Sequence, residues 1–196
     1  MASLDSVFKR GVSESKGKYL HMHLAELYEQ AHDVKGAENM WDITLKKYKK
    51  SKKVWMAVLD FRLRQGDSMI VKALLQRSLQ SLSRHKHIPV LLHYSQSEFE
   101  FGSADRGRVV YEELLSSHPK RTDIWHVFLD REIKHGNFDE ARSLFQRLIN
   151  SSKLSSRNMK TLFKKYLNFE MLHGNKDTQE AVKESARAYV ERLSAN

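Results

Sequence analysis

The chain has 196 residues, a formal net charge of +10, 40% hydrophobic residues and no cysteine. This hydrophobic content is ordinary for a globular protein and too high for a disordered one, and the length allows one domain or two. The lack of cysteine excludes disulfides, a thiolate zinc site and a cysteine nucleophile, and it fits a reducing compartment such as the cytosol or nucleus.

The composition also predicts helix along almost the whole chain. Pro89 and Pro119 are the only prolines, and there are 8 glycines, so residues that break helices are few. No apolar run reaches the roughly 18 residues of a membrane span, and the first residues lack the apolar core of a signal peptide. We therefore expect no membrane partner.

The first predicted element is a partial helix at 3–13. Its segment SVFKRGV (6–12) resembles SLFQRLI (143–149), as if it were the second helix of a missing repeat. We therefore expect the sequence to begin inside a longer array of repeats. Because an isolated repeat cannot bury its apolar face, we expect the upstream edge to be either covered by this first helix or prone to association.

Five helix pairs are predicted after this element, at a regular spacing. His32, Gly66, Gly102, Gly136 and Gly174 are separated by 34, 36, 34 and 38 residues, the period of helix–turn–helix solenoids. The fold class is therefore all-α, a right-handed α-α superhelix in a single domain, 1–196. The expected pairs are 17–50, 52–84, 88–118, 121–151 and 156–194.

Large residues recur at fixed distances before the four turn glycines, on one face of each first helix. Eleven residues before them stand Trp55, Leu91, Trp125 and Phe163. Eight before stand Val58, Tyr94, Phe128 and Tyr166, and four before stand Arg62, Glu98, Glu132 and Glu170. Each glycine is expected to be a left-handed C-cap. The following helices are expected to begin behind the capping side chains Asp33, Asp67, Ser103 and Asn137.

These positions resemble HAT (half-a-TPR) repeats, whose pattern stands here as Trp125, Phe128, Glu132, Gly136, Ala141, Arg142, Phe145 and Arg147. Longer phrases, among them HPKRTDIWHVFLDREIKHGN (118–137), resemble the C-terminal repeat domain of a large nucleolar rRNA-processing family, the programmed cell death protein 11 family. Arg62 and Leu91 depart from the motif glutamate and tryptophan.

The resemblance implies a function that the periodicity does not. It implies a non-catalytic scaffold of ribosome biogenesis in the nucleus and nucleolus. This scaffold would serve pre-rRNA cleavage and assembly of the small-subunit processome. Its partners would be ribosome-assembly proteins and pre-rRNA.

Basic residues are concentrated in one part of the chain. Residues 44–86 hold 12 basic and 2 acidic side chains. The candidate contact site for RNA or an acidic partner comprises Lys46, Lys47, Tyr48, Lys49, Lys50, Lys52, Lys53, Arg62 and Arg64. Lysines here would neutralise phosphates, and Tyr48 could stack on a base. The alternative is a solvated helix end whose lysines the helix dipole favours.

A secondary basic patch surrounds the turn into the last pair. It comprises Lys153, Arg157, Lys160, Lys164 and Lys165. Two interpretations of this patch remain: an exposed surface without a partner, or a second contact with RNA or protein.

The sequence shows no assembled catalytic or metal site. His21 and His23 are two residues apart in a predicted helix and diverge, and no G-x-S-x-G elbow or phosphate-binding loop occurs. We expect no enzyme, no cofactor and no metal. The rival to the RNA-processing scaffold is a protein-only adaptor that binds a peptide or helix, or self-associates through its repeats.

Overall fold

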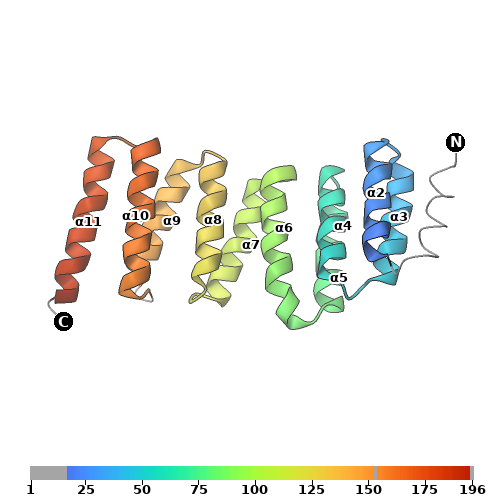
Figure 1. Ribbon diagram of the computed structural model, residues 1–196, viewed down its shortest axis with the longest axis horizontal. Helices are drawn as coiled ribbons and strands as arrows, with labels where there is room; N and C mark the ends of the chain where they lie inside the picture. Colours follow the sequence, from blue (N-terminus) through green and yellow to red (C-terminus); the bar gives the residue numbers. More distant parts are fainter. Residues whose placement is uncertain (1–16, 152–153, 195–196) are drawn as a thin grey trace. The chain divides into compact units, whose positions relative to one another are not determined.

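The computed structural model describes residues 17–151 and 154–194 (Figure 1). The predicted partial helix at 3–13 and the candidate residue Lys153 lie outside these residues. The chain divides into two compact units, unit 1 up to Leu114 and unit 2 from Leu115 onward. The organisation of all 196 residues as one domain stays a prediction.

Unit 1 consists of helix pairs, and its last helix, α7, runs across the unit boundary. Its elements are α2 (Lys18–Gln30), α3 (Val34–Lys47), α4 (Lys52–Arg64), α5 (Ser68–Ser81), the short 3-10 helix η1 (Arg84–Lys86), α6 (His87–Phe101) and α7 (Ala104–Ser117). Within the unit, α4 packs against α3, α5 and α6.

Unit 2 repeats the same arrangement. Its helices are α8 (Thr122–Lys134), α9 (Phe138–Asn150), α10 (Ser156–His173) and α11 (Lys176–Ser194). The helix α10 packs against both α9 and α11. In the described residues the secondary structure is helical and contains no strand, so the predicted all-α class of about five helix pairs is confirmed.

The aromatic residues of the repeat are buried between helices, as the periodicity predicts. Trp55 is 2% exposed and Trp125 is 7% exposed. In unit 2, Phe145 of α9 stacks on Tyr166 of α10, with ring centroids 4.4 Å apart and planes 9° apart. Apolar contact between neighbouring helices therefore holds the repeats together.

Of the four glycines predicted to be left-handed C-caps, two are confirmed and two are wrong, and His32 at the equivalent position is also left-handed. His32 (φ 57°), Gly66 (φ 79°) and Gly136 (φ 75°) adopt the left-handed conformation. Gly102 and Gly174 have φ of −126° and −112°. A side chain at either position would collide with the carboxylate of Glu98 or Glu170 four residues earlier, so these two glycines make room for a buried acid instead.

Of the predicted helix caps, Asp33 and Asp67 are confirmed, and Asn137 is wrong. The Asp33 carboxylate accepts a hydrogen bond from the Gly36 backbone N–H (2.9 Å), and Asp67 accepts one from the Ile70 N–H (3.1 Å). Asn137 does not cap α9. Its side-chain amide donates instead to Glu132 Oε2 (2.7 Å), because that carboxylate is fully buried and must be satisfied.

Candidate nucleic-acid interface

The lysine-rich segment forms the end of α3, a short turn and the start of α4. The C-cap Tyr48 donates its backbone N–H to Thr44 O (2.9 Å), and Ser51 N–H donates to Tyr48 O (2.8 Å). Trp55 holds this turn in place, because its indole N–H donates a hydrogen bond to the backbone carbonyl of Lys49 (2.7 Å). A core side chain therefore sets where the lysines lie.

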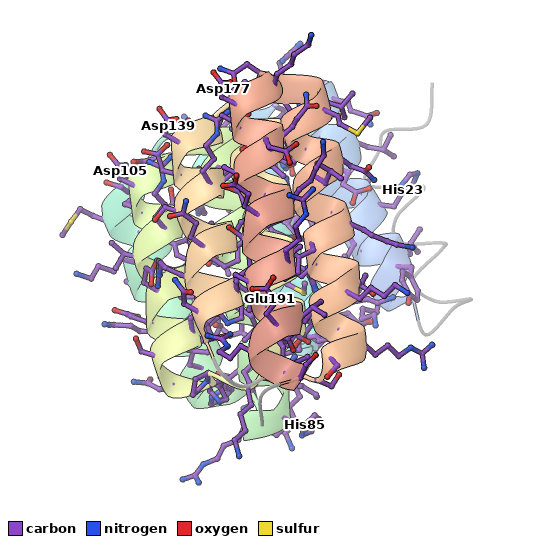
Figure 2. The ribbon with its side chains drawn as sticks, turned by 90° about the vertical axis from the view of Figure 1, so that its left-hand side faces the viewer. His23, His85, Asp105, Asp139, Asp177 and Glu191 are labelled. Atoms are coloured by element: carbon purple, nitrogen blue, oxygen red, sulfur yellow. The ribbon has the colours of Figure 1, made fainter. Side chains whose placement is uncertain are left out.

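The helix dipole accounts for only part of this lysine cluster. Lys46 and Lys47 lie in the last turn of α3, where cations are favoured, but Lys52 and Lys53 begin α4, where the dipole disfavours them. By contrast, the first turns of α9 and α11 carry Asp139 and Asp177, which point into solvent near one end of unit 2 (Figure 2). The dipole alternative does not explain Lys52 and Lys53.

Acidic side chains of the described residues do not neutralise the lysine cluster. In the described part of the chain, no carboxylate is ion-paired with Lys46, Lys47, Lys49, Lys50, Lys52 or Lys53. Two of the six contact neutral groups: Lys53 Nζ donates to Tyr19 Oη (3.3 Å), and Lys47 Nζ lies 3.2 Å from His21 Nε2. An ammonium can only donate, so that nitrogen of His21 is the acceptor. Burial and the charge of Lys47 lower the pKa of His21, which favours this neutral form.

A groove of about 520 Å³ lies beside the turn. Two members of the cluster, Lys46 and Lys49, line it together with Arg77 of α5. Its remaining lining residues are Asp42, Leu45, Trp55 and Ser81. Three cations from two helices and a turn therefore face one cavity that has a tryptophan in its wall. Arg77 is missing from the sequence-predicted site, because only the packing of α5 beside α3 and α4 brings it there.

Tyr48 is partly enclosed by its own chain. The ring of His21 meets it edge-on, with centroids 5.5 Å apart, and Lys47 Nζ lies 5.6 Å from its ring centroid. These contacts reduce the ring surface that a base could cover, so stacking on Tyr48 stays a prediction.

Arg62 and Arg64 are not brought together with the lysines. They lie at the opposite end of α4, about 14–18 Å further along the helix at 1.5 Å per residue. Arg62 is ion-paired with Glu38, and Arg64 Nη2 donates to Glu29 Oε2 (2.7 Å). These pairs join α4 to the preceding helix pair, so we separate the two arginines from the lysine-rich site.

The secondary basic patch is only partly available. Arg157, Lys160 and Lys164 are exposed on α10, whereas Lys165 donates to Asp130 Oδ1 (2.6 Å). Burial, with a contribution from the nearby Lys165 charge, lowers the pKa of His126. Lys160 and Lys164 also line an apolar groove between α10 and α11.

The carboxylates of the repeat motif hold helices together. Glu98, Glu132 and Glu170 are each at most 1% exposed. Arg106 donates to Glu98 from Nε (3.0 Å) and Nη2 (2.9 Å), and Arg142 donates from Nε to Glu170 Oε1 (2.9 Å). Their oxygens are thus occupied by the chain itself.

Neither a metal-ligand cluster nor a membrane-spanning helix occurs in the described ranges. Within 17–151 and 154–194, no three His, Asp or Glu side chains group as metal ligands, and no helix has the length and apolar character to cross a bilayer. His23 points outward from α2 (Figure 2), whereas His21 is buried, as expected for two histidines that diverge on one helix.

A family model described as "PRP39 N-terminal HAT repeat" matches residues 86–195. The chain belongs to the HAT-repeat family. It is 36% identical over 193 residues to "Protein RRP5 homolog" of Mus musculus, covering 98% of this chain and 10% of that protein. It is 39% identical over 188 residues to "rRNA biogenesis protein RRP5" of Arabidopsis thaliana, covering 96% and 10%.

A relative of lower identity matches a shorter part of the chain. "Crooked neck-like protein 1" of Homo sapiens is 27% identical over 119 residues, covering 61% of this chain and 13% of that protein. The chain spans about a tenth of the length of the RRP5 relatives. The predicted resemblance to HAT repeats is confirmed, and the match to RRP5 proteins agrees with the rRNA-processing family expected from the sequence.

Proposed function

We propose that this chain is a non-catalytic HAT-repeat scaffold of ribosome biogenesis that contacts pre-rRNA through its lysine-rich turn. The names of the RRP5 relatives, which describe rRNA biogenesis proteins, support the process. The finer role is service in pre-rRNA cleavage and small-subunit processome assembly, in the nucleolus, beside ribosome-assembly proteins.

The observation that carries the RNA contact is the groove between α3, α5 and the turn. Lys46, Lys49 and Arg77 line one cavity, and none of them is ion-paired within the described residues. Asp42 lines the same cavity and lowers its net charge. Cations without partners release counterions from a phosphate backbone, which gives an affinity that depends on salt and not on base sequence.

The test is fluorescence anisotropy with a labelled single-stranded RNA at several salt concentrations. We expect the triple variant Lys46→Glu, Lys49→Glu, Arg77→Glu to bind roughly ten-fold or more weakly than the wild type at low salt. The slope of log K against log salt should fall by about 2, since each lost phosphate contact removes about 0.7.

The matched control is Lys35→Glu, Lys120→Glu, Lys176→Glu. It changes the net charge by the same amount at exposed positions outside the groove. We expect it to retain most of the affinity. An equal loss of affinity in both variants would show that binding depends on net charge and not on the groove. Negligible RNA binding by the wild type would contradict the RNA contact and favour the protein-only adaptor.

A further inference from the structure

The helices α10 and α11 enclose an apolar groove in unit 2. Its volume is about 520 Å³, and its apolar walls come from Phe163, Leu167, Tyr189, Val190 and Leu193. Val190 is 58% exposed and Leu193 is 47% exposed. Two large aliphatic side chains one helical turn apart therefore face solvent beside a wall of aromatic rings.

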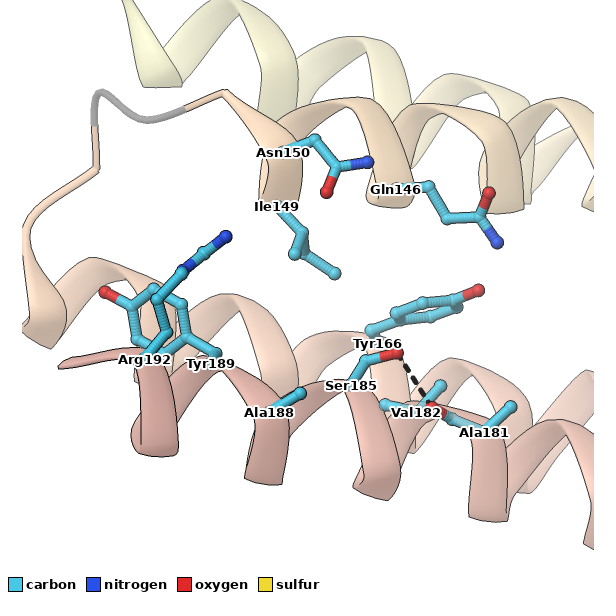
Figure 3. A pocket seen from close by; sticks show the side chains of 10 residues that line it. All are labelled: Gln146, Ile149, Asn150, Tyr166, Ala181, Val182, Ser185, Ala188, Tyr189 and Arg192. Carbon is cyan, nitrogen blue, oxygen red and sulfur yellow. Dashed lines mark hydrogen bonds between the residues drawn. The ribbon is translucent and has the colours of Figure 1, made fainter. Parts of the chain in front are cut away.

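A second cavity lies on the other side of α11. Its volume is about 350 Å³, it is bordered by α9, α10 and α11, and Ser185 Oγ within it donates to Ala181 O (2.9 Å; Figure 3). Val182 and Tyr189 line this cavity and the apolar groove alike. Three helices, α9, α10 and α11, thus line this cavity, whereas α10 and α11 alone line the apolar groove.

The repeat shows what covers such a face. ARSLFQRL (141–148) corresponds to ARAYVERL (186–193), so Phe145 matches Val190 and Leu148 matches Leu193. On α9 these positions are buried, with Phe145 at 0% and Leu148 at 1% exposed, and Phe145 stacks on Tyr166 of α10. A further helix that docks on α11 as α10 docks on α9 would bury the groove.

The charge around the groove selects the kind of helix. Lys160, Lys164 and Lys183 line it too. Lys183 is paired with Glu180 (2.9 Å), whereas Lys160 and Lys164 form no ion pair among the described residues. A second copy docking through the same face would bring these lysines against their own equivalents, since a two-fold interface uses one patch twice. A helix with acidic flanks complements them.

We propose that the α10–α11 groove binds an amphipathic helix of a partner protein. Its apolar stripe enters between the helices, and its flanking Asp or Glu residues pair with Lys160 and Lys164. This site is independent of the RNA contact in unit 1, and it gives the secondary basic patch a protein partner.

The test titrates the full 196-residue chain into fluorescently labelled synthetic helices of about 18 residues, with anisotropy as the readout. One peptide carries a Leu/Phe stripe flanked by Glu. The second has Lys in place of each Glu, and the third has the first composition with the stripe scrambled. We expect the Glu-flanked peptide to bind at least roughly ten-fold more tightly than either control, because it alone meets both the apolar wall and the lysines.

Two variants and a control locate the binding. Val190→Glu with Leu193→Glu, and separately Lys160→Glu with Lys164→Glu, should each weaken the Glu-flanked peptide by roughly ten-fold or more. Met171→Glu with Leu172→Glu adds the same charges at exposed apolar positions outside the groove and should bind as wild type. If the variant Val190→Glu with Leu193→Glu loses its helical circular dichroism signal, the variant Val190→Ser with Leu193→Ser is tested instead.

Several results would overturn the proposal. Equal binding of all three peptides, or undiminished binding by both groove variants, would remove the site. A dimer by light scattering that Val190→Glu with Leu193→Glu converts to monomer would assign the groove to a second copy. RNA binding that is lost in Lys160→Glu with Lys164→Glu, without any peptide binding, would assign the lysines to nucleic acid.

Discussion

The pairs α4–α5 and α10–α11 use the same repeat positions to build opposite kinds of surface. Trp55 and Phe163 occupy equivalent positions, and each lines a groove. Beside Trp55 the groove is completed by Lys46, Lys49 and Arg77, whereas beside Phe163 it is completed mainly by apolar residues of α11. The repeat fixes an aromatic wall, and the neighbouring helices decide whether the surface suits an anion or an apolar helix.

The same two pairs differ in sign at the position four residues before the turn. Arg62 of α4 pairs with Glu38 of α3, and Glu170 of α10 pairs with Arg142 of α9. Glu38 and Arg142 hold matching positions, as AENMWDITL (37–45) and ARSLFQRLI (141–149) show. Arg62 therefore departs from the HAT motif together with its partner, and the ion pair between successive helix pairs is kept with its charges exchanged.

Removing the two aromatic walls should give the largest effect. Trp55→Ala is expected to destabilise unit 1 by about 3–5 kcal/mol, because it opens a cavity and frees the Lys49 carbonyl. Phe163→Ala should cost about 3 kcal/mol, the low end of this range, because Phe163 borders an open groove. Urea denaturation followed by circular dichroism measures both.

Trp55→Phe serves as the control, since it keeps most of the apolar volume and removes the hydrogen bond to Lys49, which contributes about 1 kcal/mol. Equal costs for Trp55→Ala and Trp55→Phe would contradict a packing role for the indole.

Exchanging charges at the motif position should have a smaller effect. Arg62→Glu is expected to destabilise by about 1–2 kcal/mol, because it places a second acid against Glu38, whose 39% exposure screens the interaction. Adding Glu38→Arg should restore most of the loss by recreating the arrangement of Glu170 and Arg142. A double-mutant cycle in urea gives the coupling energy, and additive losses would show that Arg62 and Glu38 do not stabilise each other.

The periodicity of the sequence was sufficient to predict the helical class, the burial of Trp55 and Trp125, and the left-handed turns at Gly66 and Gly136. These features depend on residues close together in the chain. The roles of Gly102 and Gly174 were missed because they depend on the orientation of the buried carboxylates of Glu98 and Glu170. Arg62 was grouped with the lysines because its partner lies 24 residues away on another helix. The open groove on α11 was missed because local spacing does not reveal which apolar face lacks a neighbour.

Glu98 extends the comparison to a third helix pair and gives the smallest effect. Burial raises the pKa of Glu98, but hydrogen bonds from Arg106, Tyr94 Oη and the Ser103 N–H outweigh it and hold the pKa below its ordinary value. A lowered folded-state pKa means that this stabilisation is complete above the unfolded pKa of about 4.3 and is lost as the pH falls through the folded pKa.

Glu98→Gln should therefore cost on the order of 1 kcal/mol at neutral pH, a value reduced because Arg106 is 48% exposed. Its stability should also fall less steeply than that of the wild type below about pH 4.3. Urea titrations at successive pH values measure this slope. Glu113→Gln, an exposed glutamate on α7, should follow the wild-type curve. If the Glu98→Gln curve ran parallel to the wild type through the acid range, Glu98 would not be the group whose protonation loosens this pair, and the acid sensitivity would belong to another carboxylate.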